Sequence, residues 1–205
     1  MKTLVILSSI LGEQSHSSKL ARHAIERIRR ADPGAEVIVR DLGADPVPYF
    51  DAQTAGALFT APEARTPEQQ RIVDLSDELI AELFAADHVV FAVPVYNFSV
   101  PAQLKSYFDL VARAGVTFRY TANGPEGLIL GKRATVLYAR GGFAEGTPLD
   151  TVTPYLQTFL GFLGLKDVEF VAAEGLKMGD EAQSRGLSRA LGRIDVLFAP
   201  ALQAA

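Results

Sequence analysis

The sequence contains no cysteine and no tryptophan. The absence of cysteine excludes disulfide bonds, thiolate metal ligands and a cysteine nucleophile. The sequence also lacks a long apolar run: none approaches the length of about 20 residues that a membrane helix needs. Residues 4–11 are aliphatic except for Ser8 and Ser9, but Lys2 is the only basic residue before them and no small-residue cleavage site follows, so we interpret them as a buried strand rather than a signal peptide. We therefore expect a soluble cytoplasmic protein.

Basic residues are not in excess. The 20 Lys and Arg residues face 24 Asp and Glu residues, a formal net charge of −4, whereas a nucleic-acid binder needs a basic surface. With 48% hydrophobic residues, the chain can build a substantial core, and it contains no repeat or linker. We predict a single domain spanning residues 1–205. No two of the three histidines have the spacing of metal ligands, so no metal site is expected.

Short aliphatic runs alternate with helical patterns along the chain. Strands are predicted at 2–8, 36–41, 88–93, 133–139 and 168–173, and helices from Ser17 or Ser18 to about 31, from Thr66 past Leu83, and at 101–113, 151–163 and 181–198. Residues 43–65 are predicted to be a long loop, and 118–121 a short extended segment before a turn at 123–125. This alternation predicts an α/β fold, a doubly wound five-stranded parallel sheet with helices on both faces.

Three loops at the carboxyl ends of the predicted strands are unusual, and in an open α/β sheet ligands bind there. The first loop, 8–18, is rich in hydroxyl groups and leads into a helix, whose free N–H groups can hold a phosphate. It lacks both the dinucleotide fingerprint and the P-loop motif. The alternative is that Ser17 and Ser18 only cap the helix.

The other two loops suit a flat amphipathic ring. Residues 94–101 place two aromatic side chains and the amide of Asn97 at a strand end. Residues 139–143 contain Gly141 and Gly142, which allow the backbone to approach a ligand closely, and the donor Arg140. Taken singly, these features also fit core aromatics and a turn with a solvated arginine. Their joint placement favours a ligand site.

The motifs resemble those of the bacterial FMN-dependent NADH-azoreductases, quinone reductases of flavodoxin-like fold. The resemblance spans nearly the whole chain and is carried by Ser9, residues 15–17, 94–98, 103–121, 140–142 and 153–162. It implies that the FMN phosphate is held by Ser9, Ser15, His16 and Ser17. It also implies that the flavin ring is flanked by Val95, Tyr96, Asn97, Phe98, Ala139, Arg140, Gly141 and Gly142, and that the substrate pocket is lined by Asn97, Tyr120 and Phe162. Relatives often have Met in place of Val95 and Ser in place of Ala139.

The resemblance also implies an activity. It is the two-electron, ping-pong transfer of hydride from NADH or NADPH through the flavin N5 to quinones and azo compounds, without a catalytic protein side chain. Asn97 and donors from residues 140–142 would bond the ring edge and stabilise the reduced flavin. The family implies a homodimer with active sites at the interface, covered by 43–65 and 118–126. The choice between NADH and NADPH and the physiological acceptor stay open, since Phe59 stands in a region that can be basic in relatives.

Three other functions compete with this interpretation. A non-catalytic flavodoxin-type electron carrier is expected to have a more acidic docking face than a net charge of −4 indicates. A phosphoacceptor domain of the response-regulator type needs acidic residues after the first strand, where Ser8 and Ser9 stand. A hydrolase using Ser15 and His16 is disfavoured because sequence neighbours seldom form a working pair and no G-x-S-x-G motif is present.

Overall fold

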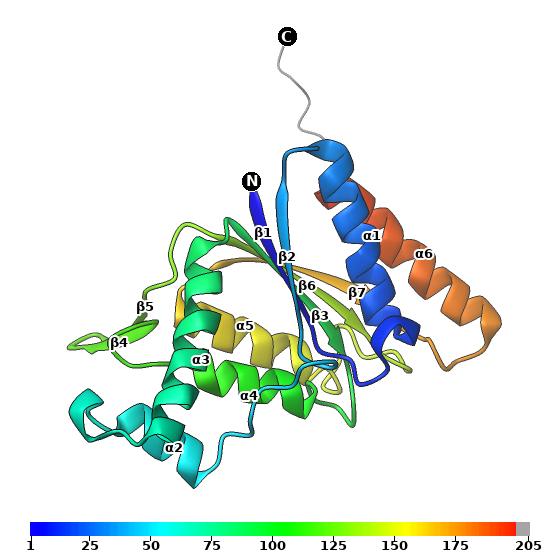
Figure 1. Cartoon of the computed structure of the whole chain (residues 1–205). Coiled ribbons are helices and arrows are strands. Elements are labelled where there is room, and N and C mark those ends of the chain that lie inside the picture. The colour runs from blue at the N-terminus through cyan, green and yellow to red at the C-terminus, as the bar shows by residue number, and fades with distance from the viewer. Residues whose placement is uncertain (200–205) are drawn as a thin grey trace.

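The computed structural model describes residues 1–199, so the last six residues of the predicted domain lie outside the described part. A parallel sheet of five strands forms the centre of the molecule, in the order β2-β1-β3-β6-β7 (Figure 1). Its strands are β1 (Lys2–Leu7), β2 (Glu36–Asp41), β3 (His88–Pro94), β6 (Arg133–Ala139) and β7 (Asp167–Ala173). The predicted doubly wound sheet is confirmed. Strand order reverses between β1 and β3, which is where such sheets bind ligands.

Helices cover both faces of the sheet. Helices α1 (His16–Ala31) and α6 (Asp180–Leu197) lie side by side on one face, and α3 (Pro67–Ala85), α4 (Ala102–Val111) and α5 (Val152–Leu163) cover the other (Figure 1). Helix α3 begins with the predicted capping box, in which Thr66 and Gln69 bond each other's backbone N–H groups. No helix within residues 1–199 has both the length and the apolar character needed to cross a membrane.

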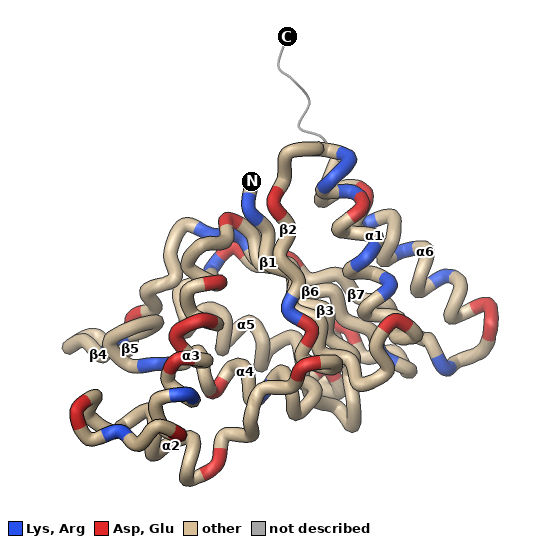
Figure 2. The backbone as a smooth tube through the Cα atoms, in the orientation of Figure 1, with Lys and Arg blue, Asp and Glu red and all other residues tan. Residues whose placement is uncertain are grey.

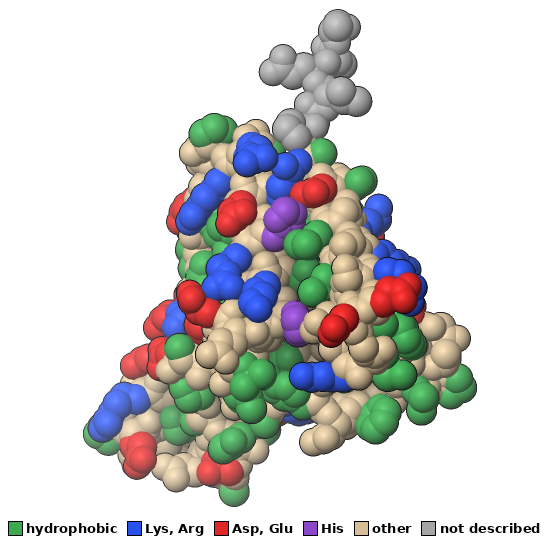
Figure 3. All heavy atoms as spheres, turned by 90° about the vertical axis from the view of Figure 1, so that its right-hand side faces the viewer, with side chains coloured by type: hydrophobic (Ala, Val, Ile, Leu, Met, Phe, Trp, Pro, Cys, Tyr) green, Lys and Arg blue, Asp and Glu red, His purple; other side chains and the backbone are tan. Residues whose placement is uncertain are grey.

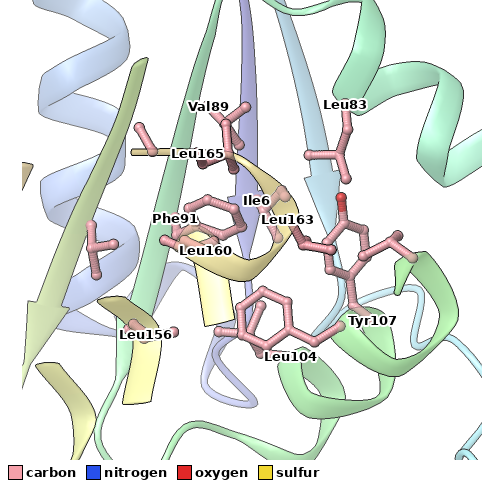
Figure 4. Close-up of a cluster of buried hydrophobic side chains, with 14 of the residues drawn as sticks. Ile6, Leu83, Val89, Phe91, Leu104, Tyr107, Leu156, Leu160, Leu163 and Leu165 are labelled. Carbon is pink, nitrogen blue, oxygen red and sulfur yellow. The ribbon is translucent and has the colours of Figure 1, made fainter. Parts of the chain in front are cut away.

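Alternate residues of the central strands enter two separate cores. Phe91 of β3 packs in the core under α3, α4 and α5, whereas its neighbours Val90 and Ala92 pack under α1 and α6. Figure 4 shows Ile6, Val89 and Phe91 in the first core, together with Leu104 and Tyr107 of α4 and Leu156 and Leu160 of α5. Because both faces are covered, all seven residues of β3 are buried. The strand ends that carry the loops are therefore held on a well-packed platform.

The first helix begins earlier than the sequence predicts. Ser15 is its N-cap residue, and Ser17 and Ser18 are buried within the first turn, so the prediction that one of them is the cap was wrong. The Ser15 hydroxyl makes no capping hydrogen bond and instead lies 3.0 Å from the Ser17 hydroxyl. The Ser15 and Ser17 hydroxyl groups therefore lie together at the helix N-terminus, and the Ser15 hydroxyl does not cap the backbone N–H groups there.

Residues 43–65 are not a continuous loop. They contain α2 (Ala52–Phe59) and a short 3₁₀ helix, Pro62–Ala64, in addition to the 3₁₀ helix Gly12–Gln14 earlier in the chain. Helix α2 is capped by Asp51, whose carboxylate accepts a 2.8 Å hydrogen bond from the Thr54 backbone N–H. Because prolines surround this segment, the Asp51 helix cap was not recognised in the sequence.

A second, two-stranded sheet projects from the main one. The predicted extended segment is confirmed as β4 (Phe118–Thr121), which pairs antiparallel with β5 (Gly124–Gly127). The second strand was not predicted, because Asn123-Gly124-Pro125 was interpreted as a turn. Thr121 pairs with Gly124, so the chain reverses one residue earlier.

Candidate functional site

Hydroxyl groups converge where β1 leads into α1. Ser9, Ser15 and Ser17 are all buried, although each carries a polar side chain. The Ser9 hydroxyl lies 3.1 Å from the hydroxyl of Tyr96, which belongs to the loop after β3. The first turn of α1 adds backbone N–H groups that have no partner within the helix. The first and second predicted loops therefore meet at a polar site suited to an anion.

His16 is the first residue of α1, and one of its ring nitrogens has no hydrogen-bond partner among the described residues. Gln183 Nε2 of α6 lies 3.3 Å from His16 Nε2, while the buried Nδ1 has no hydrogen bond with any described residue. Burial, followed by the charges of Lys19 and Lys177, lowers the pKa of His16 below its usual 6.5. The imidazole is thus neutral at neutral pH, and its orphaned nitrogen marks a position for a polar ligand atom.

The loop after β3 makes a tight reverse turn. Tyr96 and Ser99 exchange two backbone hydrogen bonds of 3.0 and 2.9 Å. Between them, Asn97 and Phe98 have φ angles of +48° and +64°, in the left-handed region that side chains other than glycine seldom adopt. Such strain collects at functional sites when the surroundings enforce it. The turn leaves the Phe98 ring 65% exposed beside a pocket.

The loop after β6 is held in place by the buried side chain of Arg140. This side chain is 7% exposed; its Nη2 donates a 2.8 Å hydrogen bond to Asp150, and its Nε lies 3.6 Å from a Glu174 carboxylate oxygen. The same Glu174 oxygen accepts hydrogen bonds from the backbone N–H groups of Ala144 and Glu145, at 3.0 and 2.9 Å. The sequence predicts that the guanidinium is a donor to a bound ring; in the structure it is paired with the carboxylates of Asp150 and Glu174, whose side chains are each 10% exposed.

The three loops enclose two adjoining pockets, of about 260 and about 360 Å³, that share Val95, Arg140 and Gly141. The first is polar at one end and is also lined by Leu11, Gln14, Ser15, His16, Pro94, Tyr96, Ala139, Leu176 and Lys177. The second is largely apolar and is also lined by Asn97, Phe98, Gly142, Phe143, Ala144 and Leu149. Together they form one groove, called here the rim groove, along the carboxyl ends of β1, β3 and β6.

The structure gathers most of the predicted site residues but not all of them. Ser9 and Ser17 are buried and line neither pocket of the rim groove, although their hydroxyl groups lie within hydrogen-bond distance of those of the lining residues Tyr96 and Ser15. Tyr120 and Phe162 also line neither pocket. They pack instead around the buried Phe118 of β4, with ring centroids 5.5 and 4.4 Å from it, and Tyr120 is 76% exposed. These three rings, called here the hairpin aromatic patch, form a separate cluster of the chain.

Two parts of the rim groove were missed in the sequence. Leu176 and Lys177 come from the loop after β7, and Ala144 and Leu149 come from the segment beyond the predicted loop 139–143. Phe143 stands in that predicted loop but was not named as a site residue. The signal for Leu176 and Lys177 was available, because the loop after β7 also lies at the carboxyl edge of the sheet. Leu149 gave no local signal, since it is a single apolar residue in an irregular segment.

The chain is similar to known proteins over nearly its whole length. Residues 1–197 match the model of the Flavodoxin_2 family, described as having a flavodoxin-like fold. The FMN-dependent NADH:quinone oxidoreductase of Bordetella parapertussis is 63% identical over 204 residues, which cover 99% of this chain and 98% of that protein. The corresponding protein of Cronobacter sakazakii is 54% identical over 196 residues, covering 96% and 98%.

Solved structures give the same relationship in three dimensions. The crystal structure of azoreductase AzrA superposes with a TM-score of 0.88 at 29% identity, covering 97% of this chain and 99% of that one. An FMN-dependent NADH-azoreductase from Bacillus anthracis, solved in complex with FMN, superposes with a TM-score of 0.85 at 26% identity, covering 97% and 100%.

Proposed function

Because this chain belongs to the Flavodoxin_2 family, of flavodoxin-like fold, we propose that it is an FMN-dependent NADH:quinone oxidoreductase that also reduces azo compounds. The names of the relatives support this activity over nearly the full length of the chain. The observation that carries the proposal is the rim groove, whose polar end suits a phosphate and whose largely apolar end suits a flavin ring. We also propose that residues 1–205 act as one FMN-binding domain.

The residues of the rim groove fit FMN. We propose that Ser9, Ser15, His16 and Ser17 hold the phosphate, and the orphaned His16 Nδ1 supports this because it leaves a buried polar atom for a ligand. Residues 95–98 and 139–142 would hold the ring largely through main-chain groups, so Val95 and Ala139 change the fit rather than the ability to bind. When bound, FMN supplies reversible hydride transfer between the dinucleotide and the acceptor.

The side chains of the apolar end orient the reactants. Asn97 lines the apolar pocket at the turn where φ is +48°, and its amide would supply donors and an acceptor to the ring edge. Phe98 and Phe143, which are 65% and 58% exposed, offer flat surfaces for stacking and exclude water from the reacting atoms. NADH or NADPH and the acceptor use this same open pocket in turn, which is the order of a ping-pong reaction.

We propose that the second wall of the substrate pocket comes from another copy of the chain. Tyr120 and Phe162 lie in the hairpin aromatic patch, away from the rim groove of their own chain. Phe118 is buried, but Tyr120 is 76% exposed, so the Tyr120 ring is the part of the patch that another chain can contact. In a homodimer, the patch of one protomer would cover the rim groove of its partner. Sedimentation velocity tests this, and a fully active monomer would refute it.

The colour of the purified protein tests the whole proposal. We expect a yellow preparation that bleaches on adding NADH under nitrogen and recovers its colour when a quinone is added. An electron carrier would be yellow as well, but NADH alone would not bleach it. A colourless protein that binds no added FMN would exclude both.

The role of Asn97 is tested by two substitutions in the same position. Asn97→Ala removes the amide and strains the turn, whereas Asn97→Gly removes the amide and tolerates φ of +48°. Both variants should slow flavin reduction in a single-turnover experiment if the amide matters. A slow Ala variant beside a normal Gly variant would assign the effect to the backbone instead.

A further inference from the structure

The polar end of the rim groove has little positive charge for a doubly charged ligand. A phosphate monoester carries a charge of about −1.5 to −2 at pH 7. The predicted phosphate ligands are hydroxyl groups, backbone N–H groups and His16, whose pKa is lowered by burial, which disfavours its charged form. Of the residues that line the first pocket, only Arg140 and Lys177 are permanently cationic, and Arg140 is paired with Asp150. Lys177 is the remaining charge.

The backbone of Lys177 is fixed against the third loop. Its N–H donates a 2.9 Å hydrogen bond to the carbonyl of Gly141, and the neighbouring Leu176 N–H lies 3.3 Å from the carbonyl of Arg140. The aliphatic stem then runs over Gly141, where an added Cβ would lie 3.1 Å from Lys177 Cγ. Because Gly141 has no side chain, the aliphatic part of Lys177 can pack against its backbone. This contact directs the Lys177 side chain along the wall of the pocket.

The ammonium group of Lys177 is uncommitted. Within the described part of the chain it forms neither a hydrogen bond nor an ion pair, although the two neighbouring basic residues of α6, Arg185 and Arg189, are paired with Glu181 and Glu145. Lys177 is near enough to His16 for its charge to act on the imidazole. It therefore stands between the Gly141 loop and the N-terminus of α1, on the wall of the polar pocket.

The basic residues of the neighbouring helices are mostly neutralised by acidic ones. Helix α1 carries five Lys and Arg residues and one Glu, and Figure 2 shows basic segments repeated along α1 and α6. Figure 3, which views this side of the molecule, shows Asp and Glu side chains interspersed with the Lys and Arg side chains. The ion pairs formed by the basic residues of these helices with acidic partners leave Lys177 as the cation available to the pocket.

From these observations we propose that Lys177 binds the phosphate of FMN and is a specificity-determining residue for FMN over riboflavin. The inference rests on the proposed function, since it assumes that the rim groove holds the flavin. A flexible ammonium is a suitable partner for a phosphate that is already oriented by hydroxyl and backbone donors, because it adds charge without demanding a fixed geometry. Lys177 is a binding residue in this scheme and takes no part in hydride transfer.

The test compares the affinities of two flavins that differ only in the phosphate. The full chain is titrated with FMN and with riboflavin, and the dissociation constants are measured by quenching of flavin fluorescence. Lys177→Gln should weaken FMN binding about three- to fivefold at low salt, the range of an exposed ion pair, and leave riboflavin binding unchanged. The difference should vanish in about 1 M NaCl, where the Debye length is about 3 Å. Lys177→Arg should restore most of the affinity.

Lys166→Gln is the matched control. Lys166 immediately precedes β7 and Lys177 follows it by a short loop, so the two lysines lie at opposite ends of a strand that spans about 20 Å. The control changes the net charge equally and should bind FMN like the unaltered chain.

Three outcomes would overturn the proposal. In the first, Lys177→Gln binds FMN as tightly as the unaltered chain. In the second, it loses equal affinity for FMN and riboflavin, which would mean a change of pocket shape. In the third, FMN binding is unchanged and only the affinity for NADH falls, which would assign the lysine to the phosphates of the dinucleotide. Failure of the proposed function looks different, because the unaltered chain would then bind neither flavin.

Discussion

Acid should destabilise this protein through His88, which is buried at the amino end of β3. The side chain is 5% exposed, its Nε2 lies 2.9 Å from the Thr135 hydroxyl, and its ring stacks on Phe198 with centroids 5.3 Å apart. Burial, assisted by the charge of Arg133 and opposed by that of Asp167, lowers the pKa of His88 from 6.5 to about 4. The folded protein therefore keeps this imidazole neutral at pH values where the unfolded chain protonates it.

The sign and size of the effect follow from linkage between protonation and folding. Stability is fully present above pH 6.5, where His88 is neutral in both states, and is lost as the pH falls from 6.5 to about 4. At pH about 5, the unfolded chain has gained about 2 kcal/mol relative to the folded one, since each pKa unit corresponds to about 1.4 kcal/mol. Below about pH 4 both states bind the proton, and this contribution stops growing.

The assay is urea unfolding at two pH values with FMN held constant. Between pH about 7.5 and about 5, the unfolding midpoint should fall by about 1 M more in the unaltered chain than in His88→Gln, for an m-value of about 2 kcal/mol/M. His23→Gln is the control, because it removes a histidine from α1 and leaves His88 in place, so the steep fall should persist. If His88→Gln loses as much stability on acidification as the unaltered chain, the reasoning about this residue is refuted.

Two further predictions concern the support of the third loop. Asp150→Asn removes the negative charge that faces the buried Arg140, so it should lower the free energy of unfolding by about 2 kcal/mol and weaken FMN binding; unchanged urea midpoints would contradict this. Gly175 has φ of +71°, and an added Cβ would lie 2.5 Å from Phe143 Cζ. Gly175→Ala should therefore cost about 1 kcal/mol or more and displace the Phe143 ring, whereas Gly192→Ala, in an open helical position, should be neutral or stabilising. Equal stabilities for the two glycine variants would count against the argument.

The sheet was predictable because its central strands are buried on both faces. Continuous aliphatic runs such as those in β1 and β3 have few other interpretations at strand length, and the capping box at Thr66 gave the start of α3 within a residue. Helix α2 was missed because its only start signal is Asp51, in a segment interrupted by prolines. The β4–β5 hairpin was half predicted, since its second strand begins with Gly124 and Pro125, which usually mark a turn.

The location of the candidate site could be predicted from the sequence, but the directions of several of its side chains could not. Residues 9–17, 94–98 and 139–142 meet because parallel strands end at one edge, which the alternation of elements implies. The direction of the Arg140 side chain could not be inferred, because its partners Asp150 and Glu174 belong to other segments. The separation of the hairpin aromatic patch from the rim groove likewise depends on how distant elements pack.

The ion pairs of Arg140 with Asp150 and Glu174 fix the conformation of the third loop, whereas other side chains of this region contact small molecules. The shaping contacts are hidden below the surface, while Phe98, Phe143 and Leu149 are more than half exposed. Exchanging these outer side chains leaves the buried ties intact, so proteins with this same backbone are free to diverge in which oxidants they prefer. Selection for a new electron acceptor would then act first on a few replaceable surface residues, at little cost to folding.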